Sequence, residues 1–71
     1  MERLLRYSLE HDRVIRLMLM KDGLLSQVNA RVIAYDAEKV EYITTRSPRP
    51  QMAERADILA ADFRKGDDGQ I

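Results

Sequence analysis

The sequence predicts a small, mainly β domain, with about five strands in a strongly bent sheet and a short N-terminal helix. The clearest observation is residues 24–46, where β-branched and aromatic residues are dense on both sides of a polar turn at Asp36-Ala37-Glu38-Lys39. Such a pattern is typical of two antiparallel strands. A second hairpin is indicated by Lys21-Asp22-Gly23, because Asp-Gly is a strong signal for a tight turn.

The length of the chain limits what can hold it together. We expect a single small domain over residues 1–66 and a polar tail over residues 67–71. A chain of this size buries only about 60% of the surface that its unfolded form exposes. It has no cysteine, so neither a disulfide nor a thiolate–metal site adds stability. The sequence therefore predicts a homo-oligomer or a protein partner.

The charge balance argues against a general nucleic-acid binder. The 12 basic and 12 acidic residues cancel to a formal net charge of zero, whereas such proteins normally carry a positive excess. Nucleic-acid binding through a local patch stays open. No apolar run approaches the ~20 residues that cross a membrane, and no signal-peptide core follows the first residues. We therefore expect a cytoplasmic protein that does not bind a membrane.

Residues 1–12 predict the short helix. Leu4, Leu5, Ser8 and Leu9 fall along one side of it, but two or three turns are too few for a stable isolated helix. We expect it to pack as a lid over the end of the sheet. His11 stands where this helix should end, where a positive imidazolium complements the helix dipole, and it is given no catalytic role.

Residues 13–20 predict the first strand. One face of this strand is wholly apolar: Ile15, Leu17 and Leu19. The opposite face also carries apolar side chains, at Met18 and Met20. These methionines are expected to fill the core, with contact to the helix or to a neighbouring subunit as the alternative.

The second strand, residues 24–35, is long and changes face. Small and apolar side chains lie on one side, at Val28, Ala30, Val32 and Ala34, whereas Ile33 and Tyr35 appear on the side that is otherwise polar. Such a switch indicates a strand that bends and serves two parts of a curved sheet. A third strand follows the polar turn and runs to Arg46.

Residues 51–65 allow two interpretations. They follow a proline-rich break at residues 47–50, which predicts an exposed loop. Taken alone, the segment predicts an amphipathic helix, because apolar residues recur at helical spacing: Met52, Ala56, Leu59 and Phe63. The other interpretation is a short strand through Met52, a tight turn at Ala56-Asp57 and a last strand over residues 58–64.

Residues suited to catalysis are few. The glycines are single and far apart, so there is no glycine-rich phosphate loop. One histidine without any cysteine does not make a zinc site of the common kind. The serines, Ser8, Ser26 and Ser47, stand in no pattern that pairs them with His11. We therefore predict that the protein is not an enzyme and takes no cofactor or metal.

Arginine is the residue type that suggests a contact surface. The candidates for contact with nucleic acid or a partner are four arginines and one tyrosine: Arg31, Tyr35, Arg46, Arg49 and Arg55. If the loop from Arg46 to Pro50 folds beside the hairpin, the arginines converge on a phosphate backbone and the tyrosine offers a stacking platform. The alternative is a solvated loop whose arginines pair with nearby carboxylates: Glu41, Glu54 and Asp57.

Two short motifs carry a family resemblance. The first is Val28-Asn29-Ala30-Arg31-Val32-Ile33-Ala34-Tyr35-Asp36, an apolar strand with a small residue that ends in aromatic-Asp. The second is Arg55-Ala56-Asp57-Ile58-Leu59, an arginine shortly before the last strand. With the order of elements over residues 14–64, they make the chain resemble the Sm-like proteins and the barrel of WYL domains. The resemblance implies a small SH3-type β-barrel.

The chain departs from both families at their signature positions. Val40 stands where the Sm motif has an asparagine that contacts RNA, and Ala56 stands where the second motif has a glycine. The Trp-Tyr-Leu signature of WYL domains is absent. The resemblance therefore predicts an architecture and no particular ligand.

Two folds and two functions follow as expectations. The first fold is an SH3-like (Sm-like) bent barrel, and the alternative is an α+β fold, a three-stranded antiparallel meander with N- and C-terminal helices. The favoured function is a non-enzymatic interaction module that self-associates, or binds a protein partner, through a sheet edge. The alternative is a small nucleic-acid-binding regulator that uses the Arg46–Pro50 loop.

Overall fold

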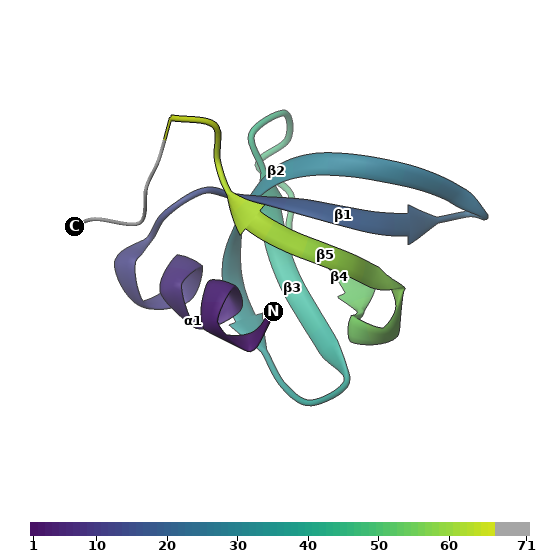
Figure 1. Ribbon diagram of the computed structural model, residues 1–71, viewed down its shortest axis with the longest axis horizontal. Helices are drawn as coiled ribbons and strands as arrows, with labels where there is room; N and C mark the ends of the chain where they lie inside the picture. The colour runs from purple at the N-terminus through teal and green to yellow at the C-terminus, as the bar shows by residue number, and fades with distance from the viewer. Residues whose placement is uncertain (67–71) are drawn as a thin grey trace.

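One helix precedes five strands in the computed structural model, which describes residues 1–66 (Figure 1). The third and fourth strands are followed by a loop and a 3-10 turn respectively. The elements in chain order are α1 (Glu2–His11), β1 (Ile15–Lys21), β2 (Leu24–Tyr35), β3 (Lys39–Thr44), β4 (Gln51–Glu54), η1 (Arg55–Asp57) and β5 (Ile58–Phe63). The predicted polar tail, residues 67–71, lies outside the described residues.

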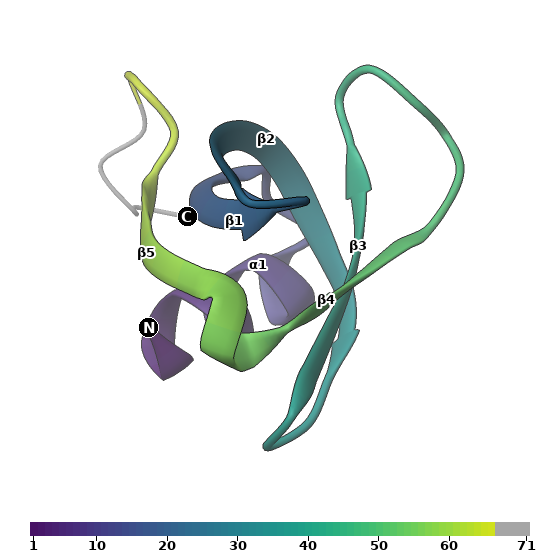
Figure 2. The same cartoon turned by 90° about the vertical axis from the view of Figure 1, so that its right-hand side faces the viewer.

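All five strands belong to one antiparallel sheet with the order β4-β3-β2-β1-β5. The mainly β class with a short N-terminal helix is therefore confirmed. The sheet curls strongly (Figure 2), but it does not close into the predicted barrel. In the described chain β4 is hydrogen-bonded to β3 alone and β5 to β1 alone, because η1 carries the backbone from one edge to the other without pairing the two strands.

The segment 51–65 forms β4, η1 and β5, so the alternative with a C-terminal helix is wrong. The turn at Ala56-Asp57 falls within η1, as the strand interpretation predicted. The strand register explains why residues 51–65 form strands although their apolar residues recur at helical spacing. Ile58 pairs with Leu19 and is 4% exposed, whereas the apolar row of the predicted helix leaves Met52 and Leu59 more than half exposed.

The helix α1 covers one end of the curved sheet, where it contacts β2 and β5 (Figures 1 and 2). Its buried side chains are Leu5 and Ser8. The helix ends at His11, and the next residue, Asp12, adopts a left-handed conformation with φ of 57°. The backbone N–H of Asp12 donates to the carbonyl of Ser8, so this end of the helix is capped by its own chain.

The two predicted turns have different chemistry. Asp22 and Gly23 both have positive φ, 53° and 77°, which are the angles of the two-residue turn that matches strand twist. At the β2–β3 turn, Asp36 Oδ1 instead accepts the backbone N–H groups of Glu38 and Lys39, both at 2.8 Å. The Asp36 carboxylate thus takes the place of backbone carbonyl acceptors for the N–H groups of Glu38 and Lys39.

A bulge in β2 explains the predicted change of face. The register with β3 shifts between Val32 and Ala34. Val32 is buried, Ala34 is exposed, and Tyr35 turns back to pack against the core. The extra residue bends the strand, as bulges do.

The core lies inside the curl of the sheet, under α1. Its buried hydrophobic residues are Leu5, Ile15, Leu17, Leu19, Ala30, Val32, Val40, Tyr42 and Ile58. The prediction that Met18 and Met20 fill this core is wrong. Both lie on the outer face of β1, where Met18 is half-buried and Met20 is 38% exposed. Within residues 1–66, no helix has the length and apolar character needed to cross a membrane.

Candidate interaction surfaces

The outer edge of β4 presents unpaired backbone groups. The N–H of Arg55 donates to the carbonyl of Glu38 at 2.7 Å, so residue 55 faces β3. Because alternate residues of an antiparallel strand direct their N–H groups to the same side, Ala53 also faces β3. Met52 and Glu54 therefore direct their N–H groups outward, away from the sheet.

The same reasoning identifies the outward groups of β5. Lys21 and Leu24 close the two-residue hairpin and so direct their hydrogen bonds at each other. Because these groups alternate along β1, the backbone N–H and C=O of Met18 point toward β5, where the paired residue is Ala60. Ala61, the next residue, directs its N–H outward. The sheet thus carries one unpaired edge at each end, within the part of the chain that is described.

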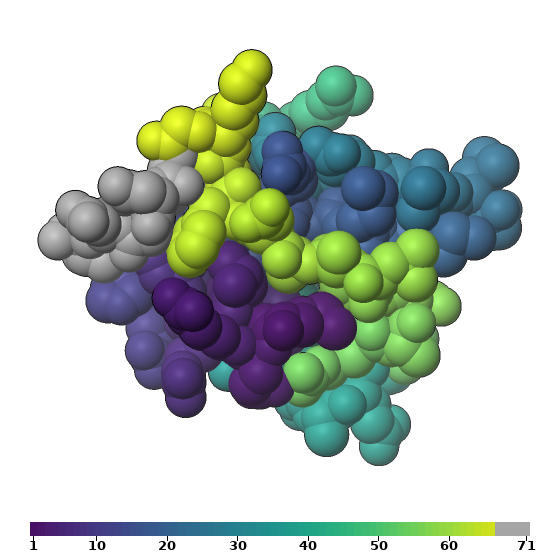
Figure 3. Space-filling view, viewed as in Figure 1, coloured from purple at the N-terminus to yellow at the C-terminus, as the bar shows by residue number. Residues whose placement is uncertain are grey.

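An apolar tip extends beyond the body of the molecule. The β1–β2 hairpin projects to the right in Figures 1 and 3. Around its turn, Met20, Leu24 and Leu25 are 38%, 71% and 61% exposed. Exposed apolar groups of this size that cluster at one place are typical of contact surfaces.

Arg55 is occupied by contacts inside the chain. Its guanidinium donates to the carbonyl of Asp36 at 2.9 Å and to Glu2 Oε1 at 2.7 Å. Its Cζ also lies 5.9 Å from the centroid of the Tyr35 ring, within the range of a cation–π interaction. One side chain therefore joins η1, the β2–β3 turn and the start of α1. Two of the predicted contact residues, Tyr35 and Arg55, are brought together here.

The contacts of Glu2 lower the pKa of its carboxyl and so make the stability of the fold depend on pH. The hydrogen bond from Arg55, followed by one from Tyr35, holds the pKa of the Glu2 carboxyl below its ordinary value. A carboxyl whose pKa is lower in the folded state stabilises the fold above its unfolded pKa, and this contribution is lost as the pH falls through the folded pKa. The pKa of Tyr35 is raised, first by loss of water and then by Glu2.

We therefore expect the Arg55→Gln variant to move the titration of Glu2 back up toward the ordinary value near 4.3. The measurement is an NMR titration of the Glu2 carboxyl carbon.

We further expect Glu2→Gln to flatten the fall in unfolding free energy below about pH 4.3. Titration of Glu2 at the same pH in the wild type and in Arg55→Gln would contradict this assignment.

The predicted arginines do not form one patch. Arg31 pairs with Asp12 beyond the C-terminal end of α1, and Arg55 pairs with Glu2 at its N-terminal end. The helix between these two carboxylates spans ten residues, about 15 Å at ~1.5 Å per residue. The alternative partners were also predicted wrongly: Glu41, Glu54 and Asp57 hold neither of these arginines.

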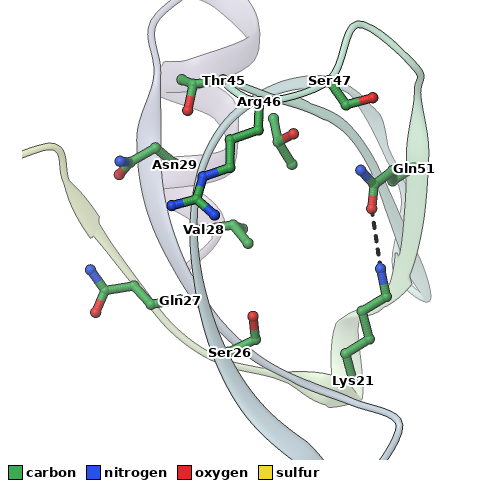
Figure 4. Close-up of a pocket in the computed structure, with 10 residues that line it drawn as sticks. Lys21, Ser26, Gln27, Val28, Asn29, Thr45, Arg46, Ser47 and Gln51 are labelled. Carbon is green, nitrogen blue, oxygen red and sulfur yellow. Dashed lines mark hydrogen bonds between the residues drawn. The ribbon is translucent and has the colours of Figure 1, made fainter.

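A polar cleft lies at the open mouth of the curled sheet, between the β1–β2 hairpin and the loop that follows β3 (Figure 4). Its volume is about 360 Å³. It is lined by Lys21, Ser26, Gln27, Val28, Asn29, Thr44, Thr45, Arg46, Ser47 and Gln51. Arg46 and Arg49 are both exposed, but Arg46 lines the cleft and Arg49, three residues along the same loop, does not.

No pattern in the sequence predicted this cleft. Its residues come from β1, β2, β3, β4 and the loop after β3, and no short motif contains more than a few of them. Only Arg46 was among the predicted contact residues. The curl of the sheet is what brings Lys21 and Gln51 together across 30 positions, through a hydrogen bond of 3.3 Å.

No family model, curated protein or solved structure matches this chain.

Proposed function

We propose that this protein is a non-enzymatic interaction module that self-associates through its sheet edges, with β4 of one copy pairing with β5 of the next. The observation that carries the proposal is the open sheet with an unpaired edge at each end of its strand order. Unpaired strand edges are templates for pairing with another chain. The exposed side chains of Met52 on β4 and Leu59 on β5 add apolar surface at the two edges.

Head-to-tail pairing is favoured over like-with-like pairing because it uses both edges. If β4 paired with β4, or β5 with β5, a dimer would form and leave the other edge of each copy unpaired. Pairing β4 with β5 satisfies both edges of every copy when the assembly closes into a ring. A 71-residue chain also gains buried area that its own small core does not supply.

The test uses proline at positions whose N–H groups point outward. Proline removes the donor and is tolerated on an edge strand. We expect Met52→Pro to shift the protein from an oligomer to a monomer in light scattering coupled to size exclusion, with its circular dichroism spectrum unchanged. Met52→Thr keeps the N–H and is the matched control, which should remain oligomeric. Ala53→Pro removes a bond to β3 and should unfold β4.

A mixing experiment separates the modes of pairing. Met52→Pro blocks β4 and Ala61→Pro blocks β5, so each variant alone should be monomeric. Because each keeps one intact edge, an equimolar mixture should form a 1:1 dimer. A dimer of Ala61→Pro alone would indicate β4–β4 pairing, and a dimer of Met52→Pro alone would indicate β5–β5 pairing. A monomeric wild type at high concentration would overturn self-association itself.

The nucleic-acid alternative stays a prediction, and the internal ion pairs of Arg31 and Arg55 weigh against it. Cytoplasmic location, absence of enzymatic activity and the resemblance to Sm-like and WYL barrels also stay predictions.

A further inference from the structure

The polar cleft has a positive lining with no acidic partner. Among its ten lining residues, Lys21 and Arg46 are cations and none is acidic. The remaining lining is mostly hydroxyl and amide groups, which donate hydrogen bonds to oxygen atoms. An excess of positive charge in a concave polar site favours an anion.

Arg46 has no carboxylate partner, in contrast to three other arginines of the described chain. Arg16, Arg31 and Arg55 each form an ion pair with a carboxylate. Within residues 1–66, the guanidinium of Arg46 has no ion-pair or hydrogen-bond partner. Figure 4 shows its side chain extending across the cleft toward Val28. Its five donors are therefore available to a ligand in the cleft.

Lys21 stands on the opposite wall, beside Gln51 (Figure 4). Its ammonium donates to Gln51 Oε1 at 3.3 Å, a long bond to a neutral acceptor that leaves the charge uncompensated. The two cations thus approach the cleft from β1 and from the loop after β3. Two such groups on opposite walls suit a phosphate, because Arg contacts two of its oxygens and Lys supplies a point charge.

The rest of the lining indicates what accompanies the phosphate. No aromatic side chain lines the cleft, so a nucleobase would have no ring to stack on. Ser26, Thr44 and Ser47 instead offer hydroxyl groups, which exchange hydrogen bonds with other hydroxyls. The volume of about 360 Å³ lies at the small end of ligand sites.

From these features we infer that the cleft is a binding site for a small phosphorylated polyol, a sugar phosphate in chemical class. Arg46 and Lys21 bind the phosphate, and the hydroxyl groups contact the polyol. The residues that line the cleft all come from one chain, and one of them, Gln51, belongs to β4, the strand proposed to pair between copies.

The test titrates the wild-type protein with ribose 5-phosphate, ribose, inorganic phosphate and a short single-stranded RNA, followed by NMR of the backbone amides. We expect ribose 5-phosphate to shift the amides of Ser26 and Thr45 at a lower concentration than inorganic phosphate does. Unphosphorylated ribose should shift neither amide.

Arg46→Gln and Lys21→Gln should each weaken binding of ribose 5-phosphate by about tenfold or more, as expected for loss of a charged hydrogen bond. Arg49→Gln is the matched control, since it removes the same charge from the same loop outside the cleft. We expect its affinity to stay within about twofold of the wild type, because Arg49 does not line the cleft and its charge acts on the ligand only through salt-screened solvent.

Three outcomes would overturn the inference. One is the absence of amide shifts in the cleft at millimolar ribose 5-phosphate. Another is an equal loss of affinity in Arg49→Gln and Arg46→Gln, which would indicate general attraction of anions. The third is RNA binding tighter than ribose 5-phosphate that depends on Arg46 and falls steeply with salt, which would assign the cleft to nucleic acid.

Discussion

Leu17→Ala should leave the protein largely unfolded at room temperature. Leu17 is fully buried in β1 and has strands on both sides, where its partners are Val28 and Ala61. Removing a buried leucine side chain costs about 2–5 kcal/mol, because the cavity that remains does not fully collapse. A core in a chain this short rarely supplies more than about 3–5 kcal/mol in total. One substitution therefore removes most of the stability.

Urea unfolding followed by circular dichroism measures this loss, with all variants at one protein concentration because association adds to stability. Leu25→Ala is the matched control, since Leu25 lies on the neighbouring strand but is 61% exposed. We expect it to change the unfolding free energy by less than about 0.5 kcal/mol. A Leu17→Ala variant as stable as Leu25→Ala would contradict the described core.

Ser8→Ala should cost about 2 kcal/mol, which is large for the loss of one oxygen atom. The Ser8 side chain is fully buried. Its Oγ accepts the backbone N–H of Val32 at 2.9 Å and donates to the carbonyl of Arg13 at 2.6 Å. Alanine leaves the Val32 donor buried without this partner, and an unsatisfied buried donor costs about 1–3 kcal/mol. The serine joins α1 to the bulged part of β2.

The control is Ser47→Ala. Ser47 Oγ also accepts a backbone N–H, from Arg49, but at 3.3 Å in an exposed loop where water replaces it. We expect a loss below about 0.5 kcal/mol there. Amide hydrogen exchange gives a second measure, because the Val32 amide should lose protection in Ser8→Ala. Unchanged protection of that amide would show that another group satisfies it.

The fold was predictable where local chemistry decides the backbone. Asp22-Gly23 has the two residues that most readily adopt positive φ at a tight turn, and the predicted bounds of β2 are those observed. The change of face at Ile33 and Tyr35 predicted a bend in this strand, and the structure places a bulge there. The third strand ends at Thr44 and not at Arg46, because the chain turns at Thr45 and Arg46 into the loop that contains Pro48 and Pro50.

The fold was hardest to predict where distant partners decide it. Residues 51–65 have helical spacing, yet Ile58 is buried only because β5 pairs with the far edge of β1. Met20 has an apolar side chain typical of a core residue, yet it lies on the part of the β1–β2 hairpin that extends beyond the core. The cleft was hidden for a related reason. Its polar residues are ordinary surface residues in sequence, and the curl of the sheet alone gathers them.

The strand order has a consequence for how the chain folds. The pairs β1–β2, β2–β3 and β3–β4 each join strands that are consecutive in the sequence, so they can form one after another. β5 alone must find a partner from the opposite end of the described chain, where Ile15 meets Phe63. Contacts between distant segments form slowly, since the intervening chain must first lose conformational entropy. β5 is therefore the strand expected to join the sheet last. During synthesis, the backbone groups of β1 that face β5 stay without hydrogen-bond partners until β5 has been made.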